Sequence, residues 1–319
     1  MIKRLAIVVP CYNEEEVFED TNAVLVSLLK DLIKRKVIKS NSYILYVDDG
    51  SKDLTWNKIE SAHENSKYVC GIKLASNKGH QNALFAGLMQ VKDEVDISIS
   101  IDADLQDDVN AIENMINKYY EGNDIVFGVR SDRSSDTGFK KTTAEIFYKL
   151  MNWLGTKTVY NSADFRLMSN RAMEELSLYS ETHLFLRGIV TELGFKTDCV
   201  YYKRSPRLKG ESKYPLKKMV NFAMDGVTSF SDKPLTIIMI LGLIAVMFSI
   251  VSVIYSLIRH TLGYTIQGWT SLFVSIWFLG GVQLVSLGVI GKYVGKTYIE
   301  SKKRPRYYIE KVLMNDNNR

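Results

Sequence analysis

The chain has 319 residues, of which 46% are hydrophobic and 24% are charged. These are ordinary proportions for a globular protein and exclude a disordered or fibrous chain. The net charge of +5 is uneven, because residues 203–233 and 292–319 each carry eight Lys or Arg against three Asp or Glu. Both basic bands flank long apolar segments, which favours a membrane surface over nucleic acid as the partner of this charge.

The first 200 residues alternate between short β-rich runs and helical patterns, which predicts an α/β domain with a mostly parallel sheet. Strands are expected at residues 5–9, 43–47, 69–74, 97–101 and 125–129, and helices at 15–33, 54–64, 81–91 and 109–120. Several of these strands end in polar clusters. Such clusters lie at the carboxyl edge of a parallel sheet, where ligands of these folds bind.

One such cluster is Asp102-Ala103-Asp104, which follows the predicted strand at residues 97–101. Residues i and i+2 of an extended segment point the same way, so both carboxylates can face one site, with Gln106 as a third contact. Two hard oxygen ligands suit Mg²⁺ or Mn²⁺ held together with the phosphates of a substrate. An isolated Asp-x-Asp is more often a solvated turn, but other acidic residues at the same sheet edge favour a metal-nucleotide site.

A second cluster is Val47-Asp48-Asp49-Gly50-Ser51. Gly50 permits a tight turn, and a carboxylate here can accept a hydrogen bond from a nucleobase or a ribose hydroxyl. The pattern is weak by itself, because Asp-Gly also marks ordinary turns. The sequence has neither a Gly-x-Gly-x-x-Gly motif after the first strand nor a Walker A motif.

Two long apolar segments follow the α/β part. Residues 234–258 and 261–291 contain no Asp, Glu, Lys or Arg, and each exceeds the roughly 20 residues that a helix needs to cross a bilayer. The basic bands on both flanks place both termini in the cytoplasm. Core helices of a soluble protein, the alternative, seldom run so long without a charge.

The predicted organisation therefore has four parts. Residues 1–214 form a cytoplasmic catalytic domain, residues 215–233 an amphipathic helix in the membrane interface, residues 234–291 a two-helix transmembrane hairpin, and residues 292–319 a basic cytoplasmic tail. A multi-pass protein of the inner cell membrane is expected.

Six ordered motifs resemble those of the family 2 glycosyltransferases, which have the GT-A fold. They are Val9-Pro10-Cys11-Tyr12-Asn13-Glu14, Val47-Asp48-Asp49-Gly50-Ser51, Asn77-Lys78-Gly79, Asp102-Ala103-Asp104-Leu105-Gln106-Asp107, Ala163-Asp164-Phe165-Arg166-Leu167 and Arg207-Leu208-Lys209-Gly210-Glu211-Ser212-Lys213-Tyr214. With two carboxy-terminal spans, the chain is similar to the bacterial polyisoprenyl-phosphate glycosyltransferases, relatives of dolichyl-phosphate mannose synthase.

This resemblance implies roles for individual residues. Donor binding would involve Pro10, Tyr12, Asn13, Glu14, Val47, Asp49, Lys78, Gly79, Asp102, Ala103 and Gln106. Asp102, Asp104 and Gln106 would surround Mg²⁺ or Mn²⁺, and Arg130, Arg207 and Lys213 would contact phosphates of the donor or acceptor. A catalytic role would fall to Asp104, Asp164 and Arg166, with Asp164 acting either as a base or as an orienting residue. His80 fits a phosphate contact or a polar residue at a helix start.

The resemblance also implies a reaction, the inverting transfer of one hexose or N-acetylhexosamine to undecaprenyl phosphate for modification of cell-envelope glycans. UDP-glucose or UDP-N-acetylglucosamine is the expected donor, and GDP-mannose is the alternative. The processive-synthase motif Gln-x-x-Arg-Trp is absent from the sequence, which favours a single transfer. A non-catalytic, membrane-anchored sugar-nucleotide binding protein is the alternative of another class. We expect a homo-oligomer that binds no nucleic acid.

Overall fold

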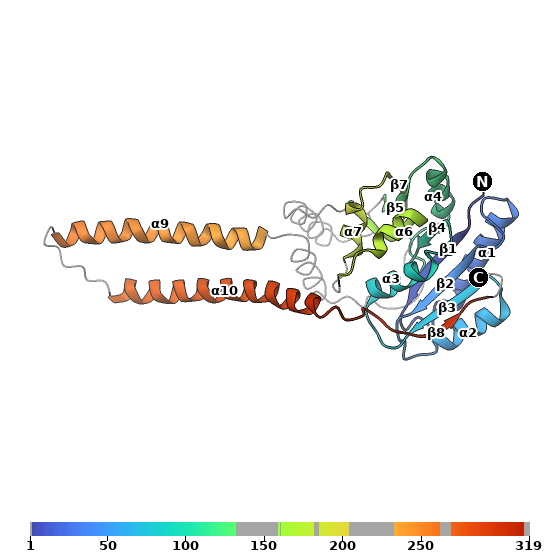
Figure 1. The fold of residues 1–319 in the computed structure, drawn as a ribbon, viewed down its shortest axis with the longest axis horizontal. Helices are drawn as coiled ribbons and strands as arrows, with labels where there is room; N and C mark the ends of the chain where they lie inside the picture. The colour runs from blue at the N-terminus through green and yellow to red at the C-terminus, as the bar shows by residue number, and fades with distance from the viewer. Residues whose placement is uncertain are drawn as a thin grey trace.

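The structure is a computed structural model that describes residues 2–131, 159, 161–181, 185–203, 233–261 and 269–315. Its centre is an eight-stranded sheet with the strand order β7-β5-β6-β4-β1-β2-β3-β8 (Figure 1). The strands are β1 (Leu5–Cys11), β2 (Tyr43–Asp48), β3 (Val69–Leu74), β4 (Ile97–Ser100), β5 (Ile125–Arg130), β6 (Ser162–Ser169), β7 (Thr197–Tyr202) and β8 (Ile309–Leu313).

Most neighbouring strands of this sheet run parallel. β1 pairs in parallel with β2 and β4, β2 pairs in parallel with β3, and β5 pairs in parallel with β7. β6 is inserted antiparallel between β4 and β5, and β8 is antiparallel to β3. The predicted α/β class with a mostly parallel sheet is confirmed, and the five expected strands are present within about two residues of their predicted ends.

Helices cover both faces of the sheet. α1 (Phe18–Lys34), α2 (Thr55–Asn65) and α4 (Ala111–Tyr120) pack on one face, and α3 (His80–Val91), α6 (Asn170–Ser177) and α7 (Leu186–Glu192) pack on the other. Side chains of β1 alternate between the two cores, with Ile7 in the first and Val8 in the second. A strand covered on both faces needs apolar residues at every position, which explains why the central strands read as continuous apolar runs.

The carboxy-terminal segment returns to the sheet as β8, beside β3. Residues 292–319 were expected to be a tail, yet Glu310 pairs with Lys73 at 3.1 Å and Lys311 pairs with Glu60 at 3.1 Å. The guanidinium of Arg306 lies 4.3 Å from the ring centre of Phe85. This segment is therefore part of the α/β domain, although it follows the two long helices in the sequence.

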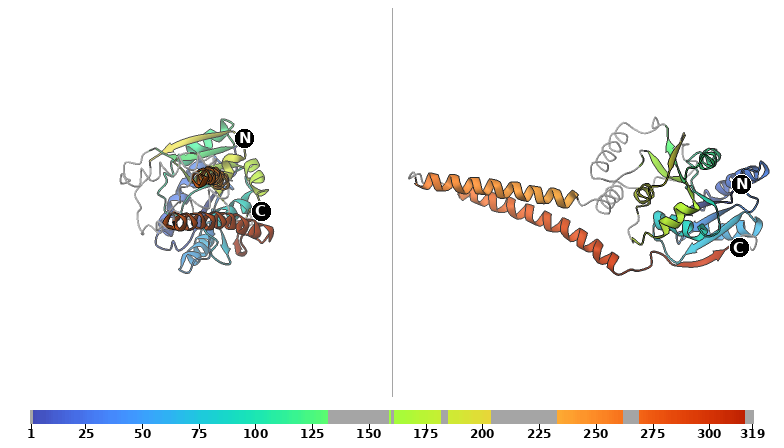
Figure 2. Two further views of the ribbon diagram at one scale, coloured as in Figure 1. Left: turned by 90° about the vertical axis from the view of Figure 1, so that its left-hand side faces the viewer. Right: turned by 45° about the horizontal axis from the view of Figure 1, so that its top comes forward.

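These two helices, α9 (Lys233–Thr261) and α10 (Trp269–Ser301), lie side by side and project away from the sheet (Figures 1 and 2). α10 continues ten residues past the predicted end of the second span at residue 291. Among the described residues, one stretch is long and apolar enough to cross a membrane. It is Phe278–Ser301, with a mean hydropathy of 1.3 and none of it buried. The two-span topology stays a prediction. Residues 215–232 of the predicted interfacial helix lie outside the described residues.

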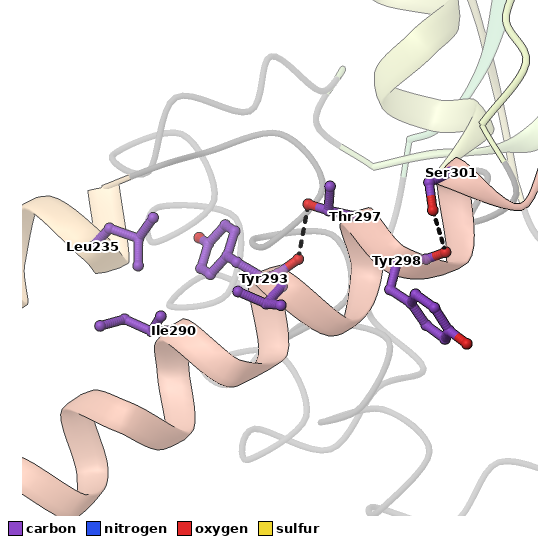
Figure 3. A pocket seen from close by; sticks show the side chains of 7 residues that line it. Leu235, Ile290, Tyr293, Thr297, Tyr298 and Ser301 are labelled. Atoms are coloured by element: carbon purple, nitrogen blue, oxygen red, sulfur yellow. Dashed lines mark hydrogen bonds between the residues drawn. The ribbon is translucent and has the colours of Figure 1, made fainter.

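An open hollow lies between α9 and α10 at the end nearest the sheet domain. Its volume is about 480 Å³, and it is lined by Leu235 of α9 and by Ile290, Tyr293, Val294, Thr297, Tyr298 and Ser301 of α10 (Figure 3). The hydroxyls of Thr297 and Ser301 donate to backbone carbonyls of α10 itself, at 3.1 and 2.8 Å. Their hydrogen-bonding needs are thus met within the helix.

Candidate active site

Asp102 and Asp104 emerge at the carboxyl end of β4. Ala103 between them is 6% exposed and packs in the core on the α1 face, where its carbonyl accepts a hydrogen bond from the Thr21 hydroxyl at 2.6 Å. Asp104 accepts from the backbone N–H of the buried Gln106 at 3.3 Å. Ala103 and Asp104 form a turn directly after β4, in which Ala103 is buried while Asp102 and Asp104 on either side of it are half-buried.

No group of three His, Cys, Asp or Glu side chains suited to a metal ion occurs in the described ranges. The fit for a metal therefore depends on the two carboxylates of Asp102 and Asp104. Mg²⁺ is commonly held by one or two carboxylates together with substrate phosphates, not by an all-protein cage. This donor set fits such an ion, with the remaining ligands supplied by a substrate.

His80, the first residue of α3, links the acidic turn to β6. Its Nε2 lies 3.5 Å from Asp102 Oδ1 and 3.4 Å from Asp164 Oδ2. Burial lowers the pKa of His80, but the hydrogen bond to Asp164 and the charges of Asp102 and Asp164 outweigh it and raise this pKa to about 9. His80 is therefore a cation at neutral pH. The prediction of a polar residue at a helix start is confirmed, because His80 begins α3, and the phosphate contact stays a prediction. The position between two carboxylates was not predicted.

Asp164 accepts hydrogen bonds from two arginines. Arg166 Nη2 donates to Asp164 Oδ1 at 2.7 Å, and Arg187 donates through Nε and Nη2 to the two carboxylate oxygens, each at 3.2 Å. Asp164 is 6% exposed and Arg166 is 2% exposed. Burial alone would raise the pKa of Asp164, but Arg187, His80 and Arg166 hold it well below its usual range.

The pKa of Asp102 is shifted in the opposite direction. Burial raises it most, and the neighbouring carboxylates of Asp107, Asp164 and Asp104 raise it further, while His80 lowers it. Four carboxylates therefore converge near the end of β4, and a cation bound beside Asp102 would relieve their mutual repulsion.

A second ion-pair cluster lies at the ends of β5 and β7. The Tyr202 hydroxyl donates to Asp107 Oδ1 at 2.5 Å, and Arg130 Nη2 lies 3.6 Å from the same oxygen. Arg130 and Tyr202 are register partners in the parallel pair β5 and β7, so one buried carboxylate, Asp107, holds both strand ends. Arg130, the predicted phosphate contact, is thus oriented by a residue of the acidic turn.

The loops after β1 and β2 form the other side of the site. Asp49 is 2% exposed and accepts from the backbone N–H groups of Lys78 and Gly79 at 2.7 and 2.9 Å. Asn13, at a φ of 53°, accepts from the backbone N–H of Lys52 at 2.9 Å. The Asp49 carboxylate therefore fixes the loop before α3, and its contact with the nucleoside stays a prediction.

The remaining predicted donor residues lie at the same sheet edge. Pro10 and Val47 are buried register partners in β1 and β2. Tyr12 and Glu14 are half-buried in the loop after β1, and Lys78 is exposed. The structure thus brings the motifs that follow β1, β2 and β4 to the sheet edge where Asp164 lies, near the start of β6. Arg207 and Lys213 lie outside the described residues.

Sequence reasoning missed Arg187, Asp107 and Tyr202 as members of these clusters. Arg187 is the one charged residue of the apolar run at residues 184–190, which is a weak signal by itself. Its contact with Asp164 joins α7 to β6, and this contact depends on how the two elements pack.

The comparisons with known proteins agree with this site. A family model described as glycosyl transferase family 2 matches residues 6–177. The chain is 39% identical over 312 residues to a prophage bactoprenol glucosyl transferase homolog of Escherichia coli (strain K12), covering 97% of this chain and 99% of that protein. It is 40% identical over 310 residues to the SfII prophage-derived bactoprenol glucosyl transferase of Shigella flexneri, with coverages of 97% and 98%.

Two further proteins complete the comparison. An uncharacterized glycosyltransferase of Bacillus subtilis (strain 168), YkoT, is 53% identical over 312 residues, covering 98% of this chain and 93% of that protein. Glucosyl-3-phosphoglycerate synthase from Mycobacterium tuberculosis, solved with Mg²⁺ and UDP, is 16% identical with a TM-score of 0.46, covering 71% of this chain and 77% of that chain. From the family match and the full-length relatives, the chain belongs to glycosyl transferase family 2 and is a glycosyltransferase with the GT-A fold.

Proposed function

We propose that the protein transfers a single glucose from UDP-glucose to undecaprenyl phosphate at a membrane surface. The relatives named bactoprenol glucosyl transferase, 39–40% identical over nearly their whole length, support both the sugar and the lipid carrier. The observation that carries the proposal is the acidic turn of Asp102 and Asp104 facing a cluster of cations. The acidic turn suits the metal ion that accompanies a sugar diphosphate, and the cations suit its phosphate oxygens.

The charges of this cluster support a diphosphate ligand. Asp102, Asp104, Asp107 and Asp164 carry four negative charges, and His80, Arg130, Arg166 and Arg187 carry four positive ones. These eight side chains sum to zero, so a bound divalent cation leaves an excess of two positive charges opposite the diphosphate. Mg²⁺ or Mn²⁺ held by Asp102 and Asp104, with Gln106 beside them, would stabilise the charge that develops on the leaving group.

In the proposed reaction, an oxygen of the acceptor phosphate forms a bond to the anomeric carbon. The bond from that carbon to the diphosphate breaks, its electron pair leaves with UDP, and direct displacement inverts the anomeric centre. The acceptor phosphate has a second pKa of about 6. It is therefore largely deprotonated at neutral pH and needs no base. Asp164, paired with two arginines and with a pKa well below its usual range, is a poor base, so we assign it an orienting role.

The membrane arrangement follows the same proposal. Phe278–Ser301 of α10 and the neighbouring α9 would form the transmembrane hairpin, with the sheet domain and both termini in the cytoplasm. Cysteine labelling tests this in a Cys199→Ser background, because Cys11 and Cys70 are buried. A Gly263→Cys variant should react with an impermeant maleimide in intact cells and a Ser301→Cys variant should not; the reverse pattern would refute the topology.

Transfer is tested with the full-length protein in detergent, undecaprenyl phosphate and radiolabelled UDP-glucose, UDP-N-acetylglucosamine or GDP-mannose. We expect label in the lipid fraction with UDP-glucose and metal, and its loss with EDTA. Asp104→Asn should abolish both transfer and Mn²⁺ binding measured by electron paramagnetic resonance. Asp93→Asn, whose side chain is 74% exposed, is the matched control. Label from UDP-N-acetylglucosamine or GDP-mannose alone would contradict the sugar assignment, and full activity in EDTA would contradict the metal.

A further inference from the structure

Arg187 is held in a defined position by the first turn of α7. The backbone N–H of the preceding residue, Leu186, donates to Gln81 Oε1 of α3 at 3.0 Å, and the carbonyl of Leu186 accepts from Arg166 Nη1 of β6 at 3.3 Å. The guanidinium of Arg187 in turn donates two hydrogen bonds to Asp164. Backbone and side chain are therefore both fixed before any ligand binds, which lowers the entropic cost of binding one.

The charge of Asp164 does not by itself require Arg187. Arg166, with its side chain 2% exposed, already pairs with Asp164 at the shorter distance of 2.7 Å. Two guanidinium groups therefore contact one carboxylate. This carboxylate lies close to the Asp102 turn, because His80 Nε2 contacts both Asp102 and Asp164, at 3.5 and 3.4 Å.

Accessibility separates the two arginines. The side chain of Arg166 is 2% exposed, whereas that of Arg187 is 32% exposed. Burial leaves Arg166 unable to meet a ligand from solvent, while Arg187 presents part of a planar, permanently charged group. Guanidinium groups match phosphate oxygens in geometry and bind them with charge-assisted hydrogen bonds.

We propose that Arg187 contacts a phosphate oxygen of the substrates, with Asp164 as the residue that positions it. This inference rests on the proposed function. The phosphate oxygen can belong to the diphosphate of the donor or to the phosphate of the lipid acceptor, and the experiment below distinguishes these two sources.

The test uses the full-length protein in detergent with the variants Arg187→Met and Arg187→Lys. Arg171→Met is the matched control, because Arg171 also pairs with an aspartate, Asp124, but has a 65% exposed side chain and follows the end of β6 far from Asp102. Binding of UDP with Mg²⁺ is measured by titration calorimetry. KM for each substrate and the melting temperature are measured in parallel.

If Arg187 contacts the donor, Arg187→Met should weaken UDP binding about tenfold or more, because a charge-assisted hydrogen bond is lost. If it contacts the acceptor, UDP binding should stay within twofold and KM for undecaprenyl phosphate should rise by about the same factor. Arg187→Lys should show a smaller change in the same quantity, since Lys keeps the charge and loses the fork geometry. Arg171→Met should change neither.

The inference is overturned if Arg187→Lys and Arg187→Met keep the UDP affinity and both KM values of the unmodified protein, whatever happens to the melting temperature. That result would leave Arg187 as a purely structural partner of Asp164. Failure of the proposed function looks different. The unmodified protein would then bind UDP but transfer no glucose to undecaprenyl phosphate, and the UDP arm of the test would still report on Arg187.

Discussion

The buried pair of Asp164 and Arg166 makes an asymmetric prediction about stability. Asp164→Asn removes the carboxylate that neutralises Arg166, whose side chain is 2% exposed. Arg166 would keep its hydrogen bond to the Leu186 carbonyl but would be a buried charge without a counter-ion. Breaking a buried ion pair in this way costs about 3–5 kcal/mol.

Arg166→Met should cost less, because Asp164 keeps Arg187 and His80 as partners. The loss is then mainly one charge-assisted hydrogen bond and the contact with Leu186, or about 1–2 kcal/mol. The double variant replaces both charges with neutral side chains. Its loss of unfolding free energy should be smaller than the sum of the two single losses by about 1–2 kcal/mol.

Thermal unfolding of the full-length protein in detergent, followed by intrinsic fluorescence, provides the measurement. A loss of 3 kcal/mol corresponds to a fall in melting temperature of about 6–12 °C for a domain of this size. Arg171→Met, which breaks an exposed pair, should change stability by less than about 1 kcal/mol. The reasoning fails if Arg166→Met destabilises the protein as much as Asp164→Asn, or if the two losses add within about 0.5 kcal/mol.

Three further predictions concern other parts of the domain. In Gly50→Ala, at a φ of +65°, the new Cβ would lie 2.7 Å from the backbone nitrogen of Asn77; we expect a lower melting temperature and weaker UDP binding. In Gly122→Ala, at a φ of +92°, the atom nearest to the new Cβ is Lys196 Nζ at 4.0 Å, so this control should show the smaller cost of backbone strain and unchanged UDP binding. Burial would raise the pKa of Asp96, but the backbone N–H of Arg4 and the side chain of Lys3 outweigh it and lower this pKa. The contribution of Asp96 to stability is therefore present above about pH 3.9, the pKa of an unfolded Asp, and is lost as the pH falls through the lower folded pKa. Asp96→Asn should reduce the melting temperature at pH 7 and make the melting temperature fall less steeply below pH 4. An unchanged dependence of the melting temperature on acid pH would exclude a stabilising role for the Asp96 carboxylate. Ending the chain after Arg304 removes β8 and uncovers the edge of β3; the melting temperature should fall and limited proteolysis within β3 should accelerate, while equal protease resistance would show that β8 does not support the sheet.

Local sequence determined much of this site. The apolar runs of β1 and β2 are fully buried, because strands that helices cover on both faces are mostly apolar. Asp102, Ala103 and Asp104 were expected to follow a strand at residues 97–101, and they lie directly after β4 in the structure. These features depend on neighbours in the chain and are therefore readable from it.

The long apolar segments were readable in part for the same reason. Residues 234–258 and 261–291 lack charged residues; the first segment lies within α9, and residues 269–291 of the second lie within α10. The end of α10 at Ser301 was not predicted, since Lys292 and Lys296 mark the end of the apolar run without stopping the helix. A charge ends a hydrophobic span but costs a helix little, because Lys is a good helix former.

Only the tertiary structure decided the contacts that complete the site and the sheet. β8 contains two adjacent charged residues, Glu310 and Lys311. It forms a strand because it pairs with the edge of β3, where Lys73 and Glu60 form ion pairs with these two residues. Arg187 meets Asp164 because β6 is inserted antiparallel beside β4 and α7 is tied to α3 through Gln81. Ion pairs between segments distant in the chain depend on the packing of whole elements, and no spacing rule in the sequence encodes that packing.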